Sequence, residues 1–228
     1  MDELSQSNLH FSILKTIVDC GRAPRILELA TAFEVEREVV VGALKALHED
    51  HGVVLHPKSH EVWVAHPFAT APTNFWIQSG RRGWWAPCAW CSLGAAALLD
   101  RDLTITTTIG GESEPLTIEV HHGSLSREDV YVHFPTPMVN AWDNVIFTCS
   151  TMLMFDSVQR IEDWCERHAV PLGDVQPIGK IWEFSQVWYG NHLSPQWTKW
   201  TVDEARVIFR RFGLSGPIWD LPAGGERF

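Results

Sequence analysis

The sequence lacks the features that mark membrane-spanning, secreted and disulfide-bonded proteins. No stretch approaches the roughly 18 consecutive apolar residues that a membrane-spanning helix needs, so no span is expected. The opening residues, MDELSQSNLH, hold no charged segment followed by an apolar run, which argues against a secretory signal. The cysteines number 5, which is odd, and they cannot all be paired within one chain. Together these absences predict a cytoplasmic protein with free thiols.

Basic residues are also scarce. The chain holds 18 Lys and Arg against 28 Asp and Glu, which gives a formal net charge of -10. Such a charge repels phosphate backbones at long range, so nucleic acid is not an expected partner. At 228 residues the chain can bury a core without disulfides or a structural metal, so its cysteines are not needed for stability.

The first third of the chain predicts a small helical module followed by a hairpin. Apolar residues recur at helical spacing over 9–20, and Gly21 follows as a stop signal. Two further helices are expected over 24–32 and 34–49, and a β-hairpin over 53–64. Because this is the element order of a winged helix, we expect a winged-helix-like module at residues 1–66.

The charge of this module argues against DNA binding. Between Pro24 and Asp50 the basic residues are Arg25, Arg37 and Lys45, and acidic residues outnumber them. A helix that reads a major groove places basic side chains on phosphates. The module is therefore expected to be a structural or dimerising wing, which makes a homodimer a candidate assembly.

The rest of the chain predicts a second domain at residues 73–228, after a connector at 67–72 that contains Pro, Ala and Thr. Patterns of alternation and of helical spacing predict helices over 91–99, 157–168 and 201–212, and strands over 103–109, 116–121, 131–134 and 145–149. The expected fold class is α+β, with the winged-helix-like module followed by a mostly antiparallel sheet and flanking helices.

The cysteines are the first candidates for chemistry. Cys88 and Cys91 form a CxxC pair, which is typical of a redox site or of half a zinc site. Neither reading is completed, because Cys149 and Cys165 lie too far apart to form a second CxxC. Cys91 is placed at a predicted helix start, where the helix dipole is expected to lower the pKa of its thiol. Cys20 and Cys165 lie on apolar helix faces and are interpreted as packing residues.

Several short segments in a fixed order resemble the organomercurial (alkylmercury) lyases. In that family a Trp-Cys-Ala-Leu-Asp segment begins a helix, a second cysteine follows a Phe, and a Ser-Val…Glu-Asp-Trp helix lies beyond it. The matching residues are Trp90-Cys91-Ser92-Leu93, Phe147-Thr148-Cys149, Phe155, Ser157-Val158 and Glu162-Asp163-Trp164.

The resemblance implies a soft-metal site. It assigns Cys91 and Cys149 as catalytic thiols that bind mercury, with Trp90 beside them in the pocket. Soft sulfur suits a soft metal. Cys88 is a candidate third sulfur ligand. No cofactor is required, and Hg(II), Cu(I) and Zn(II) are the candidate bound ions. The expected partners are a small organometal or other soft electrophile and a thiol reductant.

One departure from the family bears on the reaction. The family's aspartate, which helps to deliver the proton to the leaving carbon, falls at Gly94 here. Glycine offers no acid, so the donor is missing from its expected place. Candidate replacements are Asp100, Asp102, Glu183 and His192.

Three functions are therefore compatible with the sequence. The first is an organomercurial-lyase-like enzyme that uses Cys91 and Cys149. The second is a relative that binds a soft metal or a small ligand, or acts on another soft electrophile, without cleaving a carbon–mercury bond. The third is a winged-helix regulator with a ligand-sensing domain, which the acidic third helix disfavours.

Overall fold

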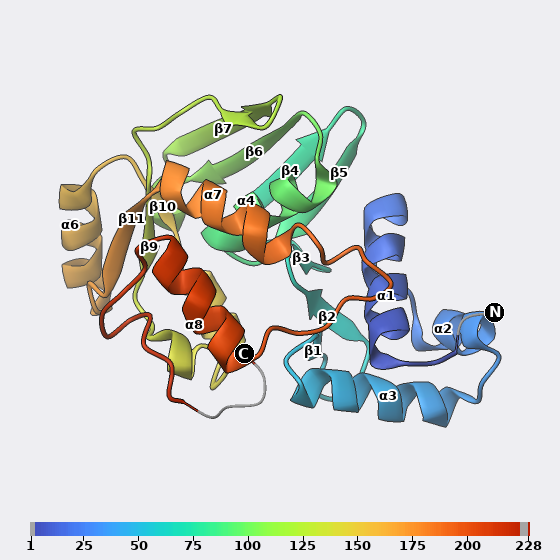
Figure 1. The fold of residues 1–228 in the computed structure, drawn as a ribbon. Helices are drawn as coiled ribbons and strands as arrows, with labels where there is room; N and C mark the ends of the chain where they lie inside the picture. Colours follow the sequence, from blue (N-terminus) through green and yellow to red (C-terminus); the bar gives the residue numbers. More distant parts are fainter. Residues whose placement is uncertain (1–2, 224–227) are drawn as a thin grey trace.

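The computed structural model describes residues 3–223 and 228, and its N-terminal part contains three helices and a hairpin. Helices α1 (Gln6–Cys20), α2 (Ile26–Phe33) and α3 (Arg37–Glu49) lie at one end of the molecule (Figure 1). Strands β1 (Val54–Leu55) and β2 (Val62–Ala65) follow as an antiparallel pair. The predicted elements are confirmed.

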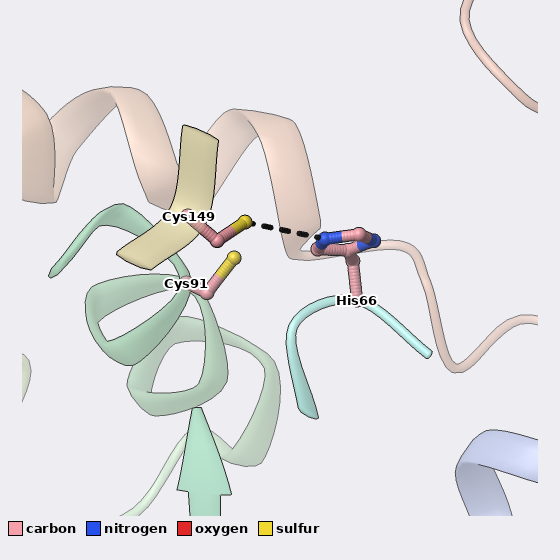
Figure 2. A group of neighbouring side chains, drawn as sticks. All are labelled: His66, Cys91 and Cys149. Atoms are coloured by element: carbon pink, nitrogen blue, oxygen red, sulfur yellow. Dashed lines mark hydrogen bonds between the residues drawn. The ribbon is translucent and has the colours of Figure 1, made fainter. Parts of the chain in front are cut away.

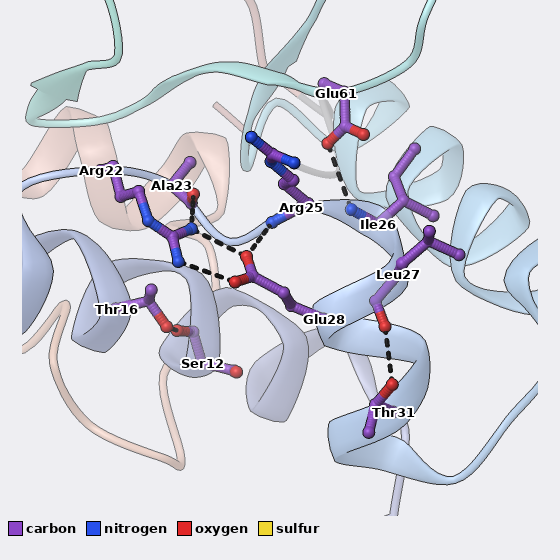
Figure 3. A network of polar contacts seen from close by, with 10 residues as sticks. All are labelled: Ser12, Thr16, Arg22, Ala23, Arg25, Ile26, Leu27, Glu28, Thr31 and Glu61. Carbon is purple, nitrogen blue, oxygen red and sulfur yellow. Dashed lines mark hydrogen bonds and ion pairs between the residues drawn. The ribbon is translucent and has the colours of Figure 1, made fainter.

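Polar contacts fix the turns of this module (Figure 3). Both guanidinium nitrogens of Arg22 donate to the Glu28 carboxylate at 2.7 Å, and the backbone N–H of Arg25 donates to it as well. The backbone N–H of Ile26 donates to Glu61, which ties helix α2 to the hairpin region. The exposed charged residues of α3 are mixed in sign and form no continuous basic face: Arg37, Glu38, Lys45 and Glu49.

One antiparallel sheet runs through the middle of the molecule. Its strand order is β1-β2-β3-β5-β4-β6-β7-β8, so the N-terminal hairpin and the later strands belong to the same sheet. The connecting strand β3 (Phe68–Ala69) pairs with β2 on one side and with β5 on the other. The remaining members are β4 (Phe75–Ser79), β5 (Arg82–Ala86), β6 (Leu103–Thr108), β7 (Pro115–His121) and β8 (Ser124–Leu125).

A second, three-stranded sheet and the C-terminal helices complete the α+β fold. Strand β9 (Tyr131–Phe134) pairs with β10 (Met154–Phe155) and with β11 (Asp174–Pro177), both antiparallel. Two 3-10 turns span Ile109–Gly111 and Met138–Asn140. The helices are α4 (Ala89–Leu99), α5 (Val145–Thr151), α6 (Val158–His168), α7 (Ile178–Tyr189) and α8 (Val202–Arg211).

Helix α4 is the centre of the core. Ten of its residues are buried, because it packs against α7 on one side and against β4 and β5 on another (Figure 1). A helix that is apolar all round is typical of such a central position. Among the described residues, no helix is long and apolar enough to cross a bilayer.

One predicted strand is wrong. Residues 145–149 were expected to be extended, but they form most of helix α5. Their β-branched residues favour a strand, yet the Asn144 side chain accepts the Phe147 N–H and caps the helix, and the Thr151 hydroxyl donates to the Phe147 carbonyl. These local bonds outweigh a weak strand propensity.

Candidate functional site

The site is a pocket between the first turn of α4, helix α5 and the C-terminal end of α7. It encloses about 560 Å³ of empty space, part of it open to solvent. Three predicted residues, Cys88, Cys91 and Cys149, lie in its wall together with Trp90. The other lining residues are His66, Met138, Ala141, Trp142, Val145, Thr148, Met152, Trp188, Tyr189, His192, Lys199 and Phe228.

Cys91 enters the pocket from the first turn of α4. Its side chain is 2% exposed, and its sulfur lies 3.5 Å from the Tyr189 hydroxyl. Burial raises the pKa of the Cys91 thiol, which corrects the expectation that the helix dipole lowers it. The physical reason is that the buried sulfur loses hydration, which disfavours the charged thiolate even in the first turn of a helix.

Cys88 holds that cap through its sulfur. The backbone N–H of Cys91 donates to the Cys88 Sγ at 3.2 Å. Although burial raises it, hydrogen bonds from the Cys149 and Cys91 thiols lower the net pKa of the Cys88 thiol. The three thiols are therefore in mutual contact, and the first proton to leave is shared by the cluster.

Cys149 faces Cys91 from helix α5, and not from a strand edge. Hydrogen bonds to the neighbouring thiols of Cys88 and Cys91, together with burial, raise the pKa of the Cys149 thiol. Its sulfur lies 3.8 Å from the Nε2 atom of His66 (Figure 2). The ligand atoms of His66, Cys91 and Cys149 all lie within 4.8 Å of one another.

Gly94 lies one turn after Cys91, and a ring from another helix occupies the space that a side chain at this position would fill. A Cβ at Gly94 would lie 2.2 Å from the Cδ2 atom of Tyr189, which is the last residue of α7. That ring is 3% exposed, so it has little room to retreat. Burial also raises the pKa of the Tyr189 hydroxyl, which keeps it protonated at neutral pH.

The predicted replacement acids lie elsewhere. Asp100 and Asp102 line a different cavity, and Glu183 is exposed on α7. His192 does line the pocket, but burial lowers its pKa well below the usual range, so its ring is neutral. The described wall of the pocket contains no Asp or Glu side chain.

Aromatic side chains form much of the wall. Trp90 stacks on Phe184 with ring centroids 4.8 Å apart and contacts Trp188 at 5.3 Å. Its buried indole nitrogen has no hydrogen-bond partner among the described residues. Such a wall excludes water and strengthens electrostatic interactions inside the pocket.

Three pocket residues carried no signal in the sequence: His66, Tyr189 and Lys199. All three lie outside the motifs from which the site was predicted. Burial lowers the pKa of Lys199 to about 7 and that of His66 to about 3. Only the fold brings His66, Tyr189 and Lys199 to the thiols, since each lies far from Cys91 in the sequence.

Comparisons with known proteins agree with this geometry. A family model described as alkylmercury lyase matches residues 68–190, which is more than half of the chain. The solved structure "Crystal structure of the mercury-bound form of MerB2" superposes with a TM-score of 0.66 at 21% sequence identity. The match covers 82% of this chain and 89% of that one, and at this identity it supports the fold. None of the curated proteins compared matches the sequence.

Proposed function

We propose that this chain, which belongs to the alkylmercury lyase family, binds a small organomercurial through Cys91 and Cys149 and cleaves its carbon–mercury bond. The observation that carries the proposal is the convergence of the two sulfurs in one buried, aromatic pocket. Thiolates are the preferred ligands of soft metals, and a dry wall favours the neutral organic group. A reducing compartment such as the cytoplasm keeps both thiols free.

The proposed reaction balances with two thiols and one further proton donor. One thiol gives its proton to the ligand with which the mercury arrived. That ligand leaves, and the sulfur bonds to mercury. The second thiol then gives its proton to solvent, no further ligand leaves, and the electron density of the added sulfur weakens the carbon–mercury bond. The electron pair of that bond then takes a proton and leaves as the hydrocarbon. Mercury(II) stays on the two sulfurs until an external thiol reductant exchanges it away.

The proton source that we propose is the Tyr189 hydroxyl. It lies 3.5 Å from the Cys91 sulfur, and its ring fills the space beside Gly94 where the family's acid would stand. It is protonated at neutral pH, since burial raises its pKa. A phenol with a raised pKa is a weak acid, so slow cleavage is expected.

A second candidate function is binding without turnover. The absence of an Asp or Glu side chain from the described wall favours it, because general acid help is typically worth about 10²–10⁴-fold in rate. In that case the pocket retains a soft metal species on Cys91 and Cys149. Cys88 then stands beside them as a third sulfur.

The test is the release of benzene from phenylmercury by the purified protein in excess thiol. We expect release that is lost in Cys91→Ser and in Cys149→Ser. Cys165→Ser is the matched control, since Cys165 lies outside the pocket. Phenylmercury that is bound stoichiometrically but not cleaved would replace the lyase with the binding function. Equal behaviour of all three variants would contradict both.

A further inference from the structure

His66 reaches the thiol pair from outside the part of the chain that matches the family model. It lies between strands β2 and β3, two residues before the matched range of 68–190 begins. Figure 2 shows its ring next to both sulfurs, with Nε2 directed toward Cys149. The family match therefore gives this imidazole no role, and its position calls for one.

The spacing of the three donor atoms suits a tetrahedral metal. Zinc binds thiolate sulfur at about 2.3 Å and imidazole nitrogen at about 2.0–2.1 Å, which places a sulfur and a nitrogen roughly 3.6 Å apart in a tetrahedral site. The distance between Cys149 Sγ and His66 Nε2 is 3.8 Å, and all three donor atoms lie within 4.8 Å. The Cys149–His66 pair is therefore within a few tenths of an ångström of the spacing that a zinc site needs.

The charge of this donor set also suits the pocket. Two thiolates and one neutral imidazole cancel the charge of a divalent ion, so the loaded site is neutral. That matters here, because the described wall offers no Asp or Glu side chain and is rich in aromatic rings. The His66 ring is held in place by an edge-to-face contact with Trp142, at 5.3 Å between ring centroids.

We propose that His66, Cys91 and Cys149 form a three-ligand Zn(II) site whose fourth position opens into the pocket. Two cysteines and one histidine with an open position are a known ligand set of catalytic zinc sites. Loading forms two Zn–S bonds and one Zn–N bond, and it releases two thiol protons to solvent. Cys88 stays outside the set, since its sulfur caps helix α4.

The site shares Cys91 and Cys149 with the proposed function, on which the assignment of those thiols rests. Zinc and an organomercurial then compete for the same sulfurs. Because mercury is the softer metal, phenylmercury displaces the zinc, and each chain releases one ion.

The experiment is a titration of the full chain, stripped of metal under reducing conditions, with Zn(II) against a chromogenic chelator. Wild type is expected to bind one zinc ion, and His66→Ala to bind it at least about 10-fold more weakly, as for loss of a group that supports a metal site. His168→Ala is the matched control, since His168 is an exposed histidine on α6. X-ray absorption of the zinc-loaded wild type should show two sulfurs and one imidazole.

The outcomes separate this site from the proposed function. A wild type that takes up phenylmercury but no zinc, or a His66→Ala variant that binds zinc like wild type, overturns the zinc site alone. Zinc binding that depends on His66, in a protein that neither binds nor cleaves phenylmercury, supports the zinc site and overturns the proposed function. A zinc spectrum with sulfur only would also overturn the role of His66.

Discussion

The resemblance to the family places the family's acid at Gly94, and the substitution Gly94→Asp tests how tightly the Tyr189 ring packs against this position. The new Cβ would lie 2.2, 2.5 and 2.9 Å from the Cδ2, Cε2 and Cγ atoms of Tyr189. All three atoms belong to a buried ring, which cannot swing aside as the end of a flexible chain can. Overpacking of this kind costs about 1–3 kcal/mol. For a chain of this size, each kcal/mol of lost stability lowers the midpoint of thermal unfolding by about 2–4 °C. The variant Gly94→Asp should therefore unfold at a midpoint roughly 2–12 °C lower.

The double variant Gly94→Asp with Tyr189→Ala isolates the cause. Removing the ring alone costs about 3–5 kcal/mol through the cavity that it leaves. If the ring is what the new side chain meets, the double variant loses less stability than the sum of the two single variants, by about 1–3 kcal/mol. The measurement is urea unfolding of all four proteins at one pH.

Gly42→Asp is the matched control. Gly42 also lies within a helix, α3, but a Cβ there meets nothing within 4 Å, so a small effect is expected. The reasoning would be refuted if Gly94→Asp melted like wild type, or if the effects at Gly94 and Tyr189 were additive. The same double variant carries a carboxyl where the family has its acid, so we expect it to release benzene faster than Tyr189→Ala does.

Three further predictions concern groups around the pocket. Tyr189→Phe keeps the ring but removes the hydroxyl, so benzene release should fall by at least about 10-fold, while one phenylmercury still binds; an unchanged rate would exclude Tyr189 as the proton source. His10 is 1% exposed and stacked on Trp197, and burial lowers its pKa to about 3 from 6.5. Between pH 6.5 and 3 the unfolded state binds the proton and the folded state does not, so the free energy of unfolding falls as the pH falls, by roughly 2 kcal/mol at pH 5. His10→Phe should flatten that dependence in urea unfolding at pH 7 and 5, and an equal slope would contradict the shift. Burial likewise lowers the pKa of Lys199 to about 7 from 10.5, so the free energy of unfolding should rise between pH 7 and 10, more steeply in wild type than in Lys199→Met. Parallel curves for those two proteins would count against a neutral Lys199.

Local signals in the sequence predicted the helix ends whose caps are formed by residues close together in the chain. The Thr201 hydroxyl and the Glu204 carboxylate form a capping box at the start of helix α8, which lies within the predicted range 201–212. Gly21 takes a positive φ of 72° at the end of α1, as a helix stop requires. In both cases the interacting residues are neighbours in the chain, so the pattern alone contains the information.

Elements that depend on partners far away in the chain were missed. The hairpin of β4 and β5 and helix α7 had no predicted counterpart, although α7 packs along α4 and supplies Tyr189. Helix α7 is covered on several sides, so apolar residues surround much of it. The helical periodicity of its apolar residues is therefore weak in the sequence. The resemblance brought Cys91 and Cys149 into one site, but the filling of the space beside Gly94 by Tyr189 depends on the packing of two helices and is not encoded in any motif.

The position of mercury in the protein after reaction with phenylmercury tests whether Cys91 and Cys149 hold the metal together. A crystal structure, supported by mercury X-ray absorption, locates the ion without reliance on rates. We expect one mercury ion bonded to the sulfurs of both Cys91 and Cys149 inside the aromatic pocket. Mercury on the exposed Cys20, or on only one of the two pocket sulfurs while the other points away, would contradict it.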